Sequence, residues 1–222
     1  MDSEKRISDQ DARSGRSPIE ILLVEDDITL ADLMQSALEI RGYKIIHAEN
    51  RRDALVALQQ NPSTRIAVID LGLPPFEHEM REGLALLSEI RLSGRNMKII
   101  VLTGQDQQAA ATAVIKDGAF DFLPKPAAIN TILSALERAS LFGRTEEALE
   151  EQGLSRIDFN AVVGEGLKQV RDEAEERLVR RVLNETNFNV HESARRLGIK
   201  RENIYYFLKK FGISRPKEND ES

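Results

Sequence analysis

The chain has 222 residues, of which 41% are hydrophobic, and a formal net charge of −6. This length fits one large domain or two small ones, and the composition is that of a globular protein. The absence of cysteine excludes disulfides and thiolate metal sites, and no apolar stretch approaches the roughly 20 residues that a membrane span requires. Because the sequence shows no hydrophobic signal segment, we expect a cytoplasmic protein with no membrane partner.

Four apolar runs in the chain each stop at residues suited to phosphate chemistry. Residues 21–24 precede Glu25 and Asp26, residues 66–69 precede Asp70, residues 99–102 precede Thr103, and a run ending at Leu123 is followed by Lys125. Aliphatic runs without alternation predict strands buried on both faces, as in a parallel sheet. The carboxyl ends of such strands share one edge, where open α/β sheets bind their ligands. We therefore expect three carboxylates, a hydroxyl and an ammonium group to converge there.

This set of groups suits metal-assisted phosphoryl transfer. Clustered carboxylates repel one another, and a hard divalent cation such as Mg²⁺ neutralises them through oxygen ligands. We expect the adjacent Glu25 and Asp26 to form the metal pair, and Asp70, which stands alone at a strand end, to be the nucleophile. Thr103 and Lys125 would then stabilise the phosphoryl oxygens.

Each of these residues also has a simpler interpretation. Glu25 and Asp26 could cap the following helix, a role that Asp27 or Thr29 could take instead. Taken singly, the other three residues would fit a turn, a strand and a solvated surface charge. The coincidence at four strand ends favours a phosphoacceptor site over these separate explanations.

The segments between these runs carry apolar residues at helical spacing. A first helix with apolar residues from Leu30 to Leu38 should end near Gly42, and further helices are predicted over residues 52–60, 84–92, 107–116 and 128–141. Five βα units result. They predict an α/β domain with a doubly wound, five-stranded parallel sheet of the flavodoxin-like kind.

Four ordered motifs resemble the receiver domain of bacterial response regulators: ILLVEDD (21–27), VIDLGLP (68–74), VLTG (101–104) and FDFLPKP (120–126). The resemblance covers residues 19–142 and implies a sensor histidine kinase as partner. It implies that Asp70 is the phosphorylation site and that Thr103 and Lys125 contact the phosphoryl group. Mg²⁺ would be bound by Asp26 directly, by Glu25 through a water molecule and by Gly72 through its backbone carbonyl. Phe122 would be an aromatic switch residue. It also implies a cis peptide bond before Pro126.

The connection after Asp70 departs from the receiver pattern. Between Pro74 and Gly83 the chain has the eight residues PFEHEMRE, where about three are usual by that resemblance. This enlarged loop, residues 75–82, could shield the phosphoryl group, reshape kinase docking or be a tolerated surface insertion. We expect His78 within it to be solvated and not a ligand. Because Gly72 is small, we expect it to leave the site more open to water.

Charge is unevenly distributed along the chain. Residues 191–217 hold eight basic and two acidic residues, a net charge of +6, which leaves −12 for the remainder. A basic terminal module suggests a polyanion as partner, although the same charges could be a solvated helix face. Helical spacing predicts a long helix over 167–183, whose apolar stripe could serve a dimer, and short helices over 190–197 and 201–211 in a helix-turn-helix.

Three motifs in this module resemble the Fis-type helix-turn-helix of nitrogen-regulatory-protein-C-like activators: ERLV (176–179), ARRLGI (194–199) and LKKFGI (208–213). The resemblance implies a small all-α domain over 166–214, after a linker at 143–165, that forms a homodimer and inserts its last helix into the major groove of double-stranded DNA. The candidate DNA-binding residues are Lys200, Arg201, Asn203, Tyr205, Tyr206 and Lys209. Tyr206-Phe207 stands where Arg-Lys is usual, so we expect a different sequence preference and lower affinity.

No segment resembles the phosphate-binding loop of the ATPase that such activators usually carry between these two domains. We expect a phosphorylation-dependent regulator that controls transcription by occupying DNA and is no enzyme beyond its own phosphorylation and dephosphorylation. The alternative is a regulator that acts through protein contacts of Tyr205, Tyr206 and Phe207 without binding DNA. The polar residues 1–18 and 215–222 should be disordered tails.

Overall fold

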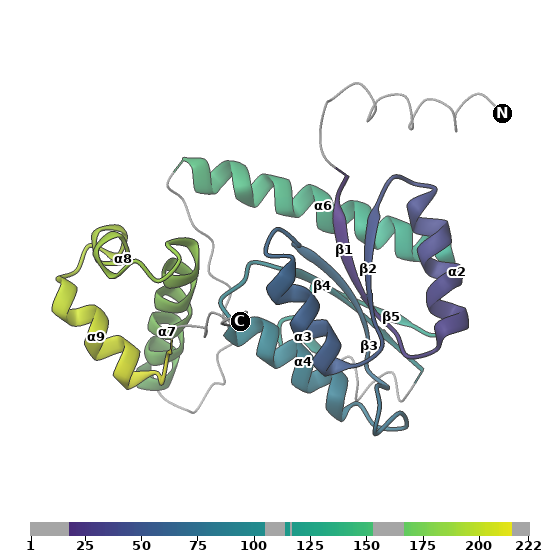
Figure 1. The fold of residues 1–222 in the computed structure, drawn as a ribbon, viewed down its shortest axis with the longest axis horizontal. Coiled ribbons are helices and arrows are strands. Elements are labelled where there is room, and N and C mark those ends of the chain that lie inside the picture. The colour runs from purple at the N-terminus through teal and green to yellow at the C-terminus, as the bar shows by residue number, and fades with distance from the viewer. Residues whose placement is uncertain (1–17, 105–113, 116, 153–166, 215–222) are drawn as a thin grey trace, which may run out of the picture. The chain divides into compact units, whose positions relative to one another are not determined.

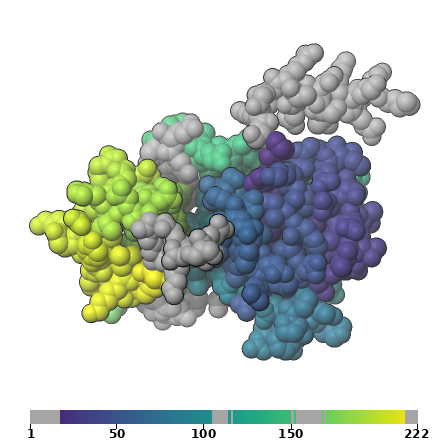
Figure 2. All heavy atoms as spheres, in the orientation of Figure 1, coloured from purple at the N-terminus to yellow at the C-terminus, as the bar shows by residue number. Residues whose placement is uncertain are grey.

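The computed structural model describes residues 18–104, 114–115, 117–152 and 167–214. They form two compact units, a parallel sheet with helices on both faces and a group of three helices. In Figures 1 and 2 residues 167–214, which begin with α7 (Leu167–Glu185), are drawn in green to yellow. Nearly all of both predicted tails and most of the predicted linker lie outside the described residues.

The sheet has five parallel strands, which confirms the predicted fold class. The strands are β1 (Glu20–Val24), β2 (Lys44–Ala48), β3 (Ile66–Asp70), β4 (Lys98–Thr103) and β5 (Asp121–Pro124). Their order is β2-β1-β3-β4-β5, so β1 and β3 flank the point where the winding reverses. No apolar run marked β2, because this edge strand is mostly half-buried and carries lysine and histidine among its residues.

Helices cover both faces of the sheet, as Figure 1 shows. They are α2 (Ile28–Glu39), α3 (Arg51–Gln60), α4 (Arg81–Leu92) and α6 (Ile129–Glu151). Because successive strand residues point to opposite faces, Ile21 and Leu23 pack with α2 and α6, whereas Leu22 and Val24 pack with α3 and α4. Of the helix predicted over 107–116, the described residues 114 and 115 are helical and the rest lies outside the described ranges.

Helix α6 runs on to Glu151, past the end predicted at Leu141. Two contacts hold its later turns: the rings of Phe142 and Phe120 meet edge to face at 5.4 Å, and Glu146 forms an ion pair with Lys98 at the start of β4, 2.6 Å apart. Both contacts join residues distant in sequence, so local periodicity could not reveal them. Among the described residues, no helix is both long and apolar enough to cross a membrane.

The second unit has the predicted helix pattern, with α7 followed by α8 (Val190–Leu197) and α9 (Arg201–Lys210). The Asn189 side chain caps α8 by accepting hydrogen bonds from the backbone N–H groups of His191 and Glu192. Gly198 ends α8 in the left-handed conformation, with φ of 65°. The buried core comprises Val179, Leu183, Ala194, Ile204 and Ile213. Val179, one of the apolar residues of the helix predicted over 167–183, therefore packs inside its own unit.

Candidate functional site

The three predicted carboxylates meet where β1 and β3 end. Glu25 and Asp26 follow β1, Asp70 is the last residue of β3, and their carboxylate oxygens lie within 4.8 Å of one another. Glu25 is 1% exposed and Asp70 is 7% exposed. Burial of charged groups is unfavourable unless an opposite charge or an ion is present, so this cluster requires positive charge.

Local structure leaves Glu25 and Asp26 available for this cluster. The residue that caps α2 is Asp27, whose Oδ1 accepts a hydrogen bond from the Leu30 N–H at 3.1 Å. The main chain of Glu25 is held on both sides: its N–H donates to the Ala48 carbonyl at 3.1 Å, and its carbonyl lies 2.8 Å from Nε2 of His47. The alternative in which Glu25 or Asp26 caps α2 thus applies to neither residue.

Lys125 supplies the positive charge within the cluster. Its ammonium donates to Oε2 of Glu25 at 2.7 Å and to Oδ2 of Asp70 at 2.8 Å. Burial acts to lower the pKa of Lys125, but the hydrogen bonds and charges of the two carboxylates outweigh it, so the pKa is raised and the ammonium form is favoured. The pKa of Glu25 is also raised, chiefly by burial, against the opposing effect of Lys125. One ammonium faces three carboxylates, and this excess of oxygen ligands fits a hard divalent cation.

The remaining predicted residues lie around this cluster. Thr103 is buried at the end of β4, and its carbonyl accepts a hydrogen bond from the Lys125 N–H at 2.7 Å. The peptide bond between Lys125 and Pro126 is cis, as expected. Gly72 donates its N–H to Oδ1 of Asp70 at 3.2 Å. Phe122 is half-buried on β5, opposite Val101 of β4, and packs against the core on the α3 and α4 side.

A pocket of about 330 Å³ opens beside the phosphoacceptor candidate. Its lining residues are Asp70, Gly72, Glu77, His78, Gly104 and Lys125. The enlarged loop supplies Glu77 and His78, which the sequence did not point to as site residues. The loop lies close to Gly72: a Cβ at position 72 would lie 2.5 Å from the Glu77 carbonyl oxygen.

The candidate DNA-binding residues lie on the solvent face of α9, except for Lys200, which directly precedes the helix. Lys200, Arg201, Asn203, Tyr205, Tyr206 and Lys209 are all exposed. Ile204, between them, is fully buried, so the outer face is defined by the packing of this helix. A guanidinium nitrogen of Arg201 donates to the Tyr205 hydroxyl at 3.4 Å, which aligns the two side chains along the face.

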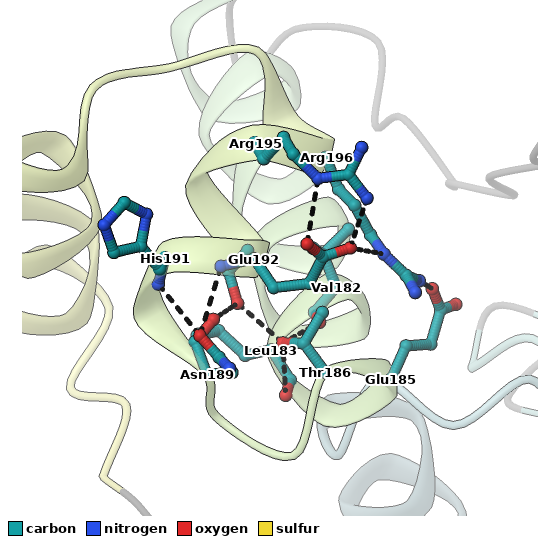
Figure 3. A network of polar contacts seen from close by, with 10 residues as sticks. Val182, Leu183, Glu185, Thr186, Asn189, His191, Glu192, Arg195 and Arg196 are labelled. Atoms are coloured by element: carbon teal, nitrogen blue, oxygen red, sulfur yellow. Dashed lines mark hydrogen bonds and ion pairs between the residues drawn. The ribbon is translucent and has the colours of Figure 1, made fainter.

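Two other cations of the module are held by acids within it, as Figure 3 shows. Glu192 accepts hydrogen bonds from Arg195 at 2.7 and 2.9 Å and from Arg196 at 3.0 Å, and Arg196 also reaches Glu185 at 3.3 Å. The hydrogen bonds from the two arginines lower the pKa of Glu192 to about 2, so this carboxylate is ionised at neutral pH. We refer to these four residues as the arginine clamp.

Lys210 is neutralised in the same way by Asp172 and Glu175 of α7, at 2.7 and 2.9 Å. Within the described part of the chain, Lys200, Arg201 and Lys209 have no such ion pair. The net charge of +6 counted along the sequence therefore overstates the positive charge that this face presents to a polyanion.

Comparison with known proteins agrees with both halves of this description. The response regulator receiver domain family matches residues 21–137, and the bacterial regulatory protein, Fis family, matches residues 170–211. The chain is 29% identical over 144 residues to the response regulator MprA of Mycobacterium sp. (strain KMS). The aligned residues cover 64% of this chain and 59% of that protein. It is 32% identical over 190 residues to the photosynthetic apparatus regulatory protein RegA of Rhodobacter capsulatus, covering 86% of this chain and 90% of that one.

A solved receiver domain of Clostridium thermocellum superposes with a TM-score of 0.52 at 26% identity, over 57% of this chain and 97% of that one. Residues 21–137, which the receiver family matches, contain the whole strand-end cluster. The chain therefore belongs to the response regulator family, and it combines a receiver domain with a Fis-family helix-turn-helix.

Proposed function

We propose that this chain is a phosphorylation-dependent, DNA-binding response regulator of a two-component system, with Asp70 as phosphoacceptor. The observation that carries the proposal is the convergence of Asp70 with two further carboxylates and Lys125 beside an open pocket. The Fis-family helix-turn-helix at the other end of the chain supplies the output. No region with the features of an ATPase was found between them in the sequence, so DNA occupancy itself is the proposed means of control.

Asp70 would act as the nucleophile. One of its carboxylate oxygens forms a bond to the phosphorus of a phosphohistidine in the sensor kinase, or of a small phosphodonor, as the bond to the leaving group breaks. The ammonium of Lys125 is already within hydrogen-bond distance of Asp70, and it would form a hydrogen bond with the phosphoryl oxygens once the group is on Asp70. Thr103 would contact the same group, and Phe122 would change its packing in response.

Glu25, Asp26, Asp70 and the carbonyl of Gly72 would hold Mg²⁺. The ion, when bound, supplies charge neutralisation for the phosphoryl group and the surrounding carboxylates. Oxygen ligands in this number fit Mg²⁺, and the excess of carboxylates over ammonium groups favours binding of a cation by the cluster.

The phosphorylation half of the proposal is tested with acetyl phosphate. We expect the wild-type chain to gain one phosphoryl group in Mg²⁺, and no gain in EDTA or for Asp70→Asn, as measured by intact-mass spectrometry. Asp53→Asn is the matched control, because Asp53 is an acid of α3 outside the cluster. Equal labelling of wild type and Asp70→Asn would contradict the assignment.

The output half is tested by binding to random double-stranded DNA as a function of salt. We expect binding to weaken steeply, with a slope of about −0.9 per phosphate neutralised, and Lys200→Ala, Arg201→Ala and Lys209→Ala each to reduce the slope. We also expect phosphorylation of Asp70 to change the affinity. Equal affinity before and after confirmed phosphorylation would contradict the switch.

A second function is favoured by one observation on α9. Tyr205 and Tyr206 are 51% and 60% exposed on the solvent face of α9, whereas Arg195 and Arg196 of α8 are paired with acids of the same module. Such a face could contact a protein instead of DNA. No binding to duplex DNA at low salt would support this protein-interaction regulator and exclude the DNA-binding one.

A further inference from the structure

The enlarged loop follows a defined path. Its turns are closed by hydrogen bonds from the Phe76 N–H to the Leu73 carbonyl at 3.1 Å and from the Glu79 N–H to the Phe76 carbonyl at 2.8 Å. The guanidinium of Arg81 lies over the Phe76 ring, 5.0 Å from its centroid. Met80 packs against the core on the α3 and α4 side. These contacts distinguish the loop from a loose surface insertion.

Two glycines allow the loop to lie close to the end of β3. A Cβ at Gly72 would lie 2.5 Å from the Glu77 carbonyl oxygen, and a Cβ at Gly83 would lie 2.5 Å from Cα of Leu71. Both distances are too short for any side chain, and in both cases the obstacle is backbone. The sequence thus has the smallest residue at both close approaches, one between Gly72 and the loop and one between Gly83 of α4 and the residue after β3.

This path brings Glu77 and His78 to the pocket that also contains Asp70 and Lys125. A phosphoryl group on Asp70 would carry negative charge into that pocket. The carboxylate of Glu77 can only repel it, whereas an imidazole N–H of His78 can donate a hydrogen bond to it. His78 is therefore the loop residue suited to face the phosphoryl group from the solvent side.

We propose that His78 is a positioning residue that lengthens the lifetime of the phosphoryl group on Asp70. This inference rests on the proposed function. Loss of the phosphoryl group requires a water oxygen to form a bond to phosphorus while the bond from phosphorus to the Asp70 oxygen breaks, which releases inorganic phosphate and restores the carboxylate. Water must approach through the pocket. His78 is an exposed residue that lines this pocket, and its imidazole would occupy part of that approach and hold the phosphoryl oxygens by hydrogen bonding.

The experiment measures decay of the phosphorylated full-length chain. Protein is phosphorylated with acetyl phosphate and Mg²⁺, the donor is removed, and the phosphorylated fraction is followed over time by intact-mass spectrometry. We expect His78→Ala to shorten the half-life about fivefold, and His78→Gln, which keeps a donor and most of the bulk, to remain within about twofold of wild type. Glu79→Ala is the matched control, because Glu79 belongs to the same loop but does not line the pocket.

The possible outcomes separate this inference from the function on which it rests. A half-life unchanged or lengthened in His78→Ala overturns the inference, and so does equal shortening in Glu79→Ala, which would indicate general loosening of the loop. Either result leaves the proposed function intact, provided that wild type is phosphorylated on Asp70. If wild type takes up no phosphoryl group, the proposed function and this inference both fail.

Discussion

The strand-end cluster of the receiver domain and the arginine clamp of the helix-turn-helix use the same kinds of charged group in opposite ways. In the cluster, Glu25, Asp26 and Asp70 lie together, the ammonium of Lys125 pairs with Glu25 and Asp70, and Asp70 and Lys125 line a pocket. In the clamp, Glu192 of α8 pairs with Arg195 and Arg196, and Glu185 at the end of α7 pairs with Arg196 and also with Arg181. The comparison teaches that an excess of carboxylates beside a pocket marks a place for an added cation, whereas arginines paired with acids of their own unit present less free charge to a partner.

Removal of Lys125 gives the largest effect expected from this comparison. Lys125→Met should lower the free energy of unfolding by about 2 kcal/mol in EDTA, because the buried carboxylate of Glu25 loses its counter-ion. Thermal unfolding followed by circular dichroism measures the loss. Mg²⁺ should recover part of it, since the cation replaces the missing positive charge. Equal stability of the two proteins in EDTA would show that the cluster is not held by Lys125.

A smaller effect is expected from the neutral polar contacts beneath the clamp. The hydroxyls of Thr186 and Ser193 are buried 2.6 Å apart, and Figure 3 shows that of Thr186 next to the carbonyls of Val182 and Leu183. Thr186→Val should lower the free energy of unfolding by about 1 kcal/mol, because Ser193 loses one partner. Faster amide hydrogen exchange in α7 and α8 measures it.

The double variant Thr186→Val with Ser193→Ala is the control for that prediction. It should cost less than the sum of the two single changes, because removing both hydroxyls leaves no unpaired group. Strict additivity would contradict the hydrogen-bond explanation.

The smallest effect is expected from opening the clamp. Glu192→Gln should free Arg195, while Arg196 keeps its ion pair with Glu185, and tighten binding to random duplex DNA about threefold, with a salt slope steeper by about 1. Glu202→Gln, at another acid of the same module, is the matched control. An unchanged slope in Glu192→Gln, or an equal change in Glu202→Gln, would show that the clamp does not limit DNA contact.

The pH dependence of the clamp has a definite sign. The pKa of Glu192 is lowered to about 2 from an ordinary value of 4.5, so its contribution is fully present above pH 4.5 and is lost as the pH falls toward 2. The ratio of the DNA affinities of wild type and Glu192→Gln, measured by the same binding experiment, should therefore be constant between pH 5 and pH 8.

Much of the fold followed from local pattern. Buried strands are continuous apolar runs, so β1, β3 and β4 were visible in the sequence. Gly42, three residues after the end of α2, and Gly198, directly after α8, both adopt positive φ and mark the ends of these helices. The edge strand β2 and the later turns of α6 were not visible, because half-burial weakens the first signal and distant contacts such as Lys98 with Glu146 fix the second.

By itself, the sequence determined that Glu25, Asp26, Asp70, Thr103 and Lys125 would meet, because parallel strands place their carboxyl ends at one edge. Only the tertiary structure decided what surrounds them. The path of the enlarged loop over Gly72, and with it the position of His78, depends on backbone contacts between segments whose residues carry no periodic signal. The tertiary structure also decided how much positive charge the helix-turn-helix offers to a partner. A count along the sequence adds up the charges, whereas in the folded chain some of them form ion pairs with one another.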